Sequence, residues 1–199
     1  MTDLPAGLGP ERKEPRPAVF IDRDGTLNHD SGYLYKFEDF RWIEGVPEAL
    51  SRLKAAGLAL AVVTNQSGVA RGIYSLADVR LIHERIDQDL RARQGMALDG
   101  WYFCPHHPDR GQCQCRKPAP GLLLAAAADL GLDIARSYMV GDKSLDVQAG
   151  LAAGVRLAIL VLTGYGPQAR KNLPEGTMVA DSFPQAAELI LSDFSAGQP

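Results

Sequence analysis

Short, continuously apolar stretches alternate with amphipathic segments along most of this chain, and this alternation constrains its fold more than any other feature. The apolar stretches predict strands at 18–22, 58–63, 101–103, 138–140 and 156–162, with a weaker one at 178–179. Between them, helical spacing of apolar residues predicts helices at 47–56, 76–90, 120–130, 144–153 and 184–191. Strands that are apolar on both faces and alternate with helices indicate an α/β fold, a parallel sheet flanked by helices.

Length and composition bound the kind of protein. A chain of 199 residues fits one domain, which we place at 18–195, after a Pro- and Gly-rich leader at 1–17 that we expect to be disordered. The longest apolar stretch is far shorter than the ~20 residues that cross a bilayer, and no export signal precedes the domain. The net charge of −3 gives no electrostatic reason to bind nucleic acid. We therefore expect a cytoplasmic monomer that binds neither nucleic acid nor membrane.

Two carboxylates follow the first predicted strand, in the segment Asp22-Arg-Asp24-Gly-Thr26. Like charges this close need a cation beside them or a shared proton, and Mg²⁺ is the usual cation for carboxylates that work together with phosphate oxygens. A calcium loop is excluded because its pattern needs glycine where Leu27 stands and glutamate where Tyr33 stands. A plain Asp/Gly turn remains the alternative for this segment taken alone.

The same segment resembles the first motif of the haloacid dehalogenase (HAD) phosphotransferase superfamily. The other motifs follow in the family's order, with Thr64 after the second predicted strand, then Lys117, then Gly141-Asp142-Lys-Ser-Leu-Asp146. The resemblance implies that Asp22 is the nucleophile, which forms an aspartyl-phosphate, and that Asp24 is the general acid and base.

The resemblance also implies how the remaining motif residues act. Thr64 and Lys117 hold the transferred phosphoryl group, and Asp146 supports Lys117 or a metal-bound water. The implied ligands of a catalytic Mg²⁺ are Asp22, Asp142 and Asp24, the last through its main-chain carbonyl. An N-cap or first-turn charge on a helix is the alternative explanation for either Asp142 or Asp146 taken alone.

Three cysteines and two histidines lie within twelve positions, as Cys104-Pro-His106-His107 and Cys113-Gln-Cys115. Three thiolates and one imidazole form a usual structural zinc site, whereas a Cys-x-Cys disulfide would be strained and would leave one thiol over. Separate buried thiols are the other alternative. Spacing leaves His106 and His107 equivalent, and the resemblance implies His106. Because Lys117 follows Cys115 so closely, we hypothesise that an ordered zinc loop also positions the lysine.

Many HAD enzymes carry a cap domain, and this chain has no room for one. From Asp24 to Thr64 is 40 positions and from Thr64 to Lys117 is 53, and both spans are already occupied by predicted elements. We expect the walls of the pocket to come instead from the loop at 28–37 and from the zinc loop.

Longer matches, including Thr64-Asn-Gln-Ser-Gly-Val-Ala-Arg-Gly72 and Cys104-Pro-His-His-Pro108, resemble the D-glycero-D-manno-heptose 1,7-bisphosphate 7-phosphatases. That resemblance implies removal of the 7-phosphate and retention of the anomeric phosphate, in the biosynthesis of nucleotide-activated heptose. The substrate contacts that it implies are Asp30, Ser31, Gly32, Tyr33, Thr64, Asn65, Gln66, Ser67, Arg116, Lys117 and Lys143.

Two alternatives remain at the level of the sequence. A histidinol-phosphate phosphatase shares the superfamily motifs and a similar zinc loop. A zinc-stabilised binding module without catalysis would have no use for five motif residues together, which counts against it. The sequence leaves open which anomer of the heptose is preferred.

Overall fold

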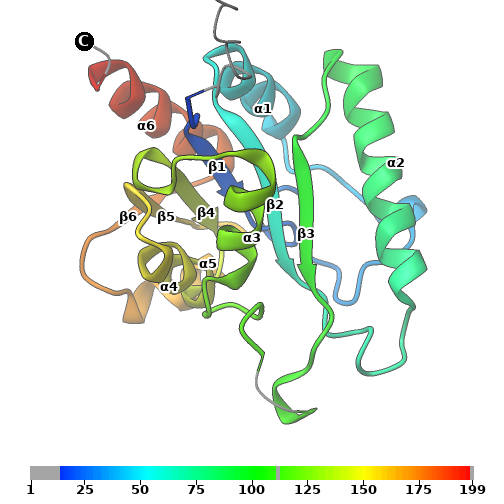
Figure 1. The fold of residues 1–199 in the computed structure, drawn as a ribbon. Coiled ribbons are helices and arrows are strands. Elements are labelled where there is room, and N and C mark those ends of the chain that lie inside the picture. Colours follow the sequence, from blue (N-terminus) through cyan, green and yellow to red (C-terminus); the bar gives the residue numbers. More distant parts are fainter. Residues whose placement is uncertain (1–13, 111–112, 198–199) are drawn as a thin grey trace, which may run out of the picture.

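The computed structural model describes residues 14–110 and 113–197, and within them six parallel strands form one sheet in the order β3-β2-β1-β4-β5-β6 (Figure 1). The strands are β1 (Ala18–Ile21), β2 (Ala59–Asn65), β3 (Gly100–Cys104), β4 (Tyr138–Gly141), β5 (Leu157–Val161) and β6 (Thr177–Ala180). The helices are α1 (Val46–Ala55), α2 (Leu76–Gln94), α3 (Gly121–Leu130), α4 (Ser144–Ala153), α5 (Gly166–Ala169) and α6 (Phe183–Ala196). The predicted parallel α/β fold is confirmed.

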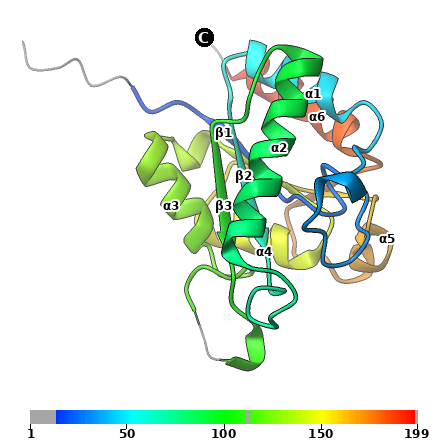
Figure 2. The ribbon, with the colours of Figure 1, turned by 90° about the vertical axis from the view of Figure 1, so that its right-hand side faces the viewer.

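Helices cover both faces of this sheet, which explains why its strands are apolar on both sides (Figures 1 and 2). Side chains alternate between the faces of β1, so Val19 and Ile21 join the core beneath α1 and α6, whereas Phe20 joins the core beneath α3 and α4. Leu50 of α1 and Leu123 of α3 are fully buried in these two cores. Packing in these two cores holds the strands in place, and the ends of these strands carry the polar motifs.

The predicted helices begin within one residue of their expected starts, whereas two of them extend beyond their expected ends. Ser75 accepts a hydrogen bond from the backbone of Asp78, and the Asp78 carboxylate accepts one in return, so a capping box opens α2. Helix α2 runs to Gln94 and α6 to Ala196, both beyond the predicted ends. Helix α5 was not predicted, because four residues are too few to show a helical period.

The residues just before β1 are attached to the domain. Arg16 pairs with Leu132 in an isolated bridge, its guanidinium lies 2.7 Å from Asp99, and the Pro17 carbonyl accepts a hydrogen bond from Ala59. Residues 1–13, most of the expected leader, lie outside the described part. None of the described helices has the length and apolar character that spanning a membrane requires.

Candidate active site and metal centre

The order of the strands opens a cleft at the carboxyl edge of the sheet. Strands β1 and β4 are neighbours in the sheet. The chain continues from β1 to β2 toward one edge of the sheet and from β4 to β5 toward the other. Ligands bind in the crevice at such a switch in strand order. Asp22 follows β1, Asp142 follows β4 and Thr64 lies near the end of β2. The cleft has a volume of about 320 Å³. Its lining comprises Asp22, Asp24, Asp30, Gly32, Tyr33, Thr64, Asn65, Gln66, Ser67, Tyr74, Arg116, Lys117, Lys143, Leu145, Asp146 and Tyr165.

Lys117 joins two carboxylates at the floor of this cleft. Its Nζ lies 2.7 Å from Asp22 Oδ1 and 2.6 Å from Asp146 Oδ1, and it donates a hydrogen bond to the Val63 carbonyl. Burial alone lowers the pKa of Lys117, but the charges of Asp146 and Asp22 outweigh burial and raise that pKa above its ordinary value. The side chain is therefore a fixed ammonium beside Asp22.

The backbone of Lys117 is held by the end of β2. The Asn65 side chain donates to the Lys117 carbonyl and accepts from the Lys117 N–H, both at 3.1 Å. Asn65 lines the cleft as expected, but its amide groups are engaged by the chain itself. Ser31, by contrast, does not line the cleft and lies in a neighbouring groove with Tyr33 and Arg41.

Asp142 is a fully buried carboxylate that lacks a hydrogen bond on one oxygen. Oδ2 accepts from the Tyr165 N–H at 2.8 Å, whereas Oδ1 has no hydrogen-bond partner among the described residues. Burial first, and then the charge of Asp22, raise the pKa of Asp142 to about 7. A carboxylate pair that is partly unsatisfied and mutually repulsive fits a hard divalent cation such as Mg²⁺.

Asp146 and Asp24 are the candidates for a third ligand beside Asp22 and Asp142. The three carboxylates Asp22, Asp142 and Asp146 have oxygens within 4.8 Å of one another. Both Asp146 oxygens already accept hydrogen bonds, one from Lys117 and one from the Lys143 N–H at 2.9 Å. Lys143 Nζ lies 3.4 Å from the Asp24 carbonyl and 3.5 Å from Asp142 Oδ1, so that carbonyl faces the same space as Asp142. Both Asp146 oxygens are thus engaged by donors, and the Asp24 carbonyl remains the other candidate ligand.

The Asp24 side chain sits in a set of hydrogen-bond donors. Arg23 donates to both oxygens, at 3.0 and 2.9 Å, Asn28 donates to Oδ1 at 3.1 Å and Gln66 donates to Oδ2 at 3.0 Å. Burial raises the pKa of Asp24, but the charge of Arg23 and these hydrogen bonds outweigh it, so the pKa lies below its ordinary value. Gln66 also donates to the Thr64 hydroxyl at 3.0 Å, which links two motif residues.

The mouth of the cleft combines cations with aromatic rings. Lys143 Nζ lies 3.6 Å from Asp30 and 4.9 Å from the centre of the Tyr165 ring. Tyr33 has a φ of 46°, a left-handed conformation that non-glycine residues seldom adopt and that is found more often at functional sites. Sequence reasoning missed Tyr74, Leu145 and Tyr165. The position of Tyr165 shortly after a strand, at the same edge of the sheet, was the one signal for it.

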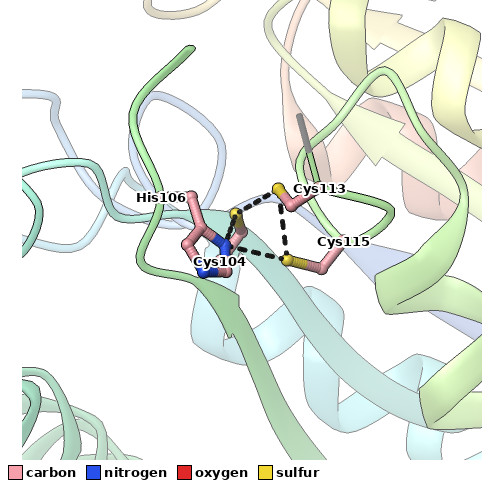
Figure 3. A group of neighbouring side chains, drawn as sticks. All are labelled: Cys104, His106, Cys113 and Cys115. Carbon is pink, nitrogen blue, oxygen red and sulfur yellow. Dashed lines mark hydrogen bonds between the residues drawn. The ribbon is translucent and has the colours of Figure 1, made fainter. Parts of the chain in front are cut away.

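The three cysteines and His106 form a compact group (Figure 3), and Arg116, which follows Cys115 in the chain, lines the cleft. The Sγ atoms of Cys104 and Cys115 lie 3.5 and 3.4 Å from Nδ1 of His106, and the Sγ of Cys113 lies 3.6 and 3.5 Å from the same two sulfurs. A tetrahedron whose centre is about 2.3 Å from each sulfur has edges of about 3.8 Å, so four donor atoms at these distances fit a zinc ion. His107 instead contacts Arg71 and Asp109, so of the two histidines only His106 joins the thiols.

Comparison with known proteins places the chain in a family. A model described as HAD-hydrolase-like matches residues 114–186. A D-glycero-beta-D-manno-heptose-1,7-bisphosphate 7-phosphatase from Yersinia pestis is 50% identical over 154 residues, 74% of this chain and 81% of the relative. The chain belongs to this family of HAD phosphatases. The enzyme of the same name from Escherichia coli K12 is 50% identical over 171 residues, 83% of this chain and 86% of the relative.

Solved structures agree with membership of the heptose-bisphosphate phosphatase family. D,D-heptose 1,7-bisphosphate phosphatase from B. bronchiseptica, complexed with magnesium and phosphate, has a TM-score of 0.81 and 37% identity, covering 89% of this chain and 99% of that one. The corresponding Burkholderia thailandensis structure has a TM-score of 0.68 and 32% identity with the same coverage. The described residues of this family member form one six-stranded parallel sheet flanked by helices.

Proposed function

We propose that this protein hydrolyses the 7-phosphate of D-glycero-β-D-manno-heptose 1,7-bisphosphate and leaves the 1-phosphate in place. The observation that carries the proposal is the Asp22 carboxylate on the floor of the cleft, 2.7 Å from the buried Lys117 ammonium. The identity of 50% to phosphatases named for this substrate supports the substrate and the β anomer.

The first half of the reaction transfers the phosphoryl group to Asp22. A carboxylate oxygen of Asp22 attacks phosphorus in line, and the bond between phosphorus and the oxygen on C7 breaks. Asp24, which its lowered pKa keeps ionised in the free enzyme, takes up the proton carried by the phosphate monoester monoanion and passes it to that leaving oxygen, while Lys117 and the Thr64 hydroxyl hold the equatorial phosphoryl oxygens. Because Lys117 is already fixed between two carboxylates, little reorganisation is needed as charge develops.

The second half releases phosphate. Asp24, now an anion, takes a proton from a water molecule that attacks the phosphorus of the aspartyl-phosphate, and the bond to the Asp22 oxygen breaks. The donors around Asp24 favour this anionic form, as the lowered pKa indicates. Asp22 is regenerated as a carboxylate that Lys117 again stabilises.

Two metal sites complete the proposal. Asp22, Asp142 and the Asp24 carbonyl would hold Mg²⁺, which supplies positive charge to the carboxylates and the phosphoryl oxygens when bound. Cys104, His106, Cys113 and Cys115 would hold a structural Zn²⁺, because four protein donors leave no open position for chemistry.

The rest of the cleft suits a small, doubly phosphorylated sugar. Arg116 and Lys143 offer cations for the second phosphate and the hydroxyls, and Asp30, Gly32 and Tyr33 also line the cleft. We propose that the enzyme is a monomer that binds a free sugar phosphate. We propose that the enzyme works in the cytoplasm, where such sugar phosphates are made.

The test compares heptose bisphosphate with histidinol phosphate in the presence of Mg²⁺, with Asp22→Asn as the inactive control. We expect a higher kcat/KM for heptose bisphosphate and no phosphate release by the variant, because an amide is a poor nucleophile. Preference for histidinol phosphate would contradict the proposed substrate. Absence of turnover with every phosphate ester would favour a binding module.

A further inference from the structure

Arg23 is a fully buried cation beside both catalytic carboxylates, and the chemistry proposed above does not use it. Arginine is seldom buried completely, and a buried guanidinium needs acceptors for its N–H groups. Nε and Nη2 donate to the two oxygens of Asp24, Nη2 also donates to the Leu34 carbonyl at 2.9 Å, and Nη1 lies 3.2 Å from Nε2 of His83. Among the described residues, His83 is thus the only side chain besides Asp24 that forms a hydrogen bond with this guanidinium.

His83 is itself held in place by its surroundings. It lies on α2, its side chain is buried, and its ring stacks on that of Trp101 in β3, with centres 4.2 Å apart. Trp101 in turn donates to Asp87 at 3.0 Å, which anchors the indole. Since arginine has no acceptor, Nε2 of His83 must be the acceptor, so the ring is neutral and carries its proton on Nδ1. Burial, followed by the charge of Arg23, lowers the pKa of His83 well below its ordinary value, in agreement with a neutral ring.

We propose that Arg23 and His83 are positioning residues that fix the Asp24 carboxylate for proton transfer. The guanidinium donates hydrogen bonds to both carboxylate oxygens and so fixes the plane of the Asp24 carboxylate. His83 and the Leu34 carbonyl in turn fix the guanidinium. Without an acceptor at position 83, Nη1 is left buried and unpaired, and the guanidinium turns toward another acceptor. Displacement of Asp24 by even one ångström then slows proton transfer steeply. This inference rests on the proposed role of Asp24 as general acid and base.

The experiment uses two substitutions at one position. His83→Phe keeps an aromatic ring against Trp101 but removes the acceptor, whereas His83→Gln restores an acceptor oxygen without the imidazole. Ile86→Val is the control, because it trims a buried side chain one turn further along the same helix without touching Arg23. For each variant we would measure kcat and KM for heptose bisphosphate, the melting temperature and the crystal structure.

We expect His83→Phe to lower kcat by about tenfold or more with little change in KM, since substrate binding does not involve His83. His83→Gln should recover most of the lost kcat, Ile86→Val should keep wild-type kcat, and the Asp24 carboxylate should be displaced only in His83→Phe. The proposal would be overturned if the Asp24 carboxylate kept its position in His83→Phe. It would also be overturned if kcat in the three variants varied with their melting temperatures and not with the presence of an acceptor at position 83. Failure of the wild-type protein to hydrolyse heptose bisphosphate would overturn the proposed function instead, while the position of Asp24 in the crystals would still test the positioning role.

Discussion

Each carboxylate on the floor of the cleft has different partners, and these partners set its chemical state. Asp22 lies against the Lys117 ammonium, Asp24 accepts hydrogen bonds from Arg23, Asn28 and Gln66, and Asp142 keeps one oxygen without a hydrogen bond. The pKa of Asp24 is accordingly lowered, whereas that of Asp142 is raised to about 7. Environments that separate the pKa values of neighbouring acids assign them different roles. Here they separate Asp24, whose donors favour the ionised form, from Asp142, whose charge a bound cation would offset.

The Asp142 oxygens are packed against Gly25, which gives a direct test of the cation site. A Cβ at Gly25 would lie 2.2 Å from Asp142 Oδ2, so Gly25→Ala must displace that carboxylate. We expect the Mg²⁺ concentration for half-maximal activity to rise by about tenfold or more. Gly57→Ala is the matched control, because Gly57 also has a positive φ, of 95°, but has nothing within 4 Å of the added Cβ.

Both glycine variants should lose stability, by about 1–2 kcal/mol for the left-handed backbone alone. Only Gly25→Ala should change the Mg²⁺ dependence of phosphate release. Equal Mg²⁺ dependence in the two variants would contradict the assignment of Asp142 as a metal ligand.

Substitution of Asp146 tests how Lys117 is held in position, because both Asp146 oxygens accept hydrogen bonds. In Asp146→Asn the amide nitrogen must face either the Lys117 ammonium or the Lys143 N–H, and both are donors. We expect kcat to fall by about ten- to a hundredfold, as Lys117 loses its fixed position. Asp78→Asn is the control, since it makes the same change in the surface capping box of α2 and should leave kcat unaltered. Wild-type kinetics in Asp146→Asn would show that Lys117 needs no such support.

The loop between β3 and α3 connects the cysteine cluster to the cleft. Arg116 donates to the His106 carbonyl at 3.0 Å, and Lys117 follows directly. The loop contributes little apolar surface of its own, so a bound metal would supply its order. Asn65 also holds Lys117, so both the loop and the end of β2 position the lysine.

Removal of one thiol tests how much the loop contributes. We expect Cys113→Ala to release zinc, measured as metal content, and to lower activity partially, because Asn65 still holds Lys117. His107→Ala is the control, since His107 lies outside the cluster and its loss should leave the zinc content intact. Full activity in zinc-free Cys113→Ala would mean that the loop does not position the lysine.

The strands and the catalytic motifs were predictable because their signals are local. Five of the predicted strands rest on continuous apolar runs, and Asp22, Thr64 and Asp142 follow such runs at one edge of the sheet. His83 was not singled out, although a polar residue four positions after Val79 stands on the buried face of a helix. Its partner Arg23 looked like an ordinary charged residue. Their roles depend on α2 packing against β3, where His83 stacks on Trp101, and on the buried Arg23 side chain reaching His83, which the sequence pattern does not reveal.

The molecule as a whole is acidic, with a net charge of −3, yet its cleft gathers cations that suit an anionic sugar. Lys117, Arg116 and Lys143 reach the cleft from two different loops, and the sheet order brings these loops to one edge. The fold thereby creates a local electrostatic environment that the overall composition does not show.

The central claim is that this cleft removes one particular phosphate from a bisphosphorylated heptose. The most direct measurement is ³¹P NMR of the product formed from the separate α and β anomers of D-glycero-D-manno-heptose 1,7-bisphosphate with Mg²⁺. We predict that the β anomer is consumed faster, that the C7 phosphorus signal is replaced by inorganic phosphate, and that the C1 signal persists. Loss of the C1 signal first, or no phosphate release from either anomer, would contradict this account.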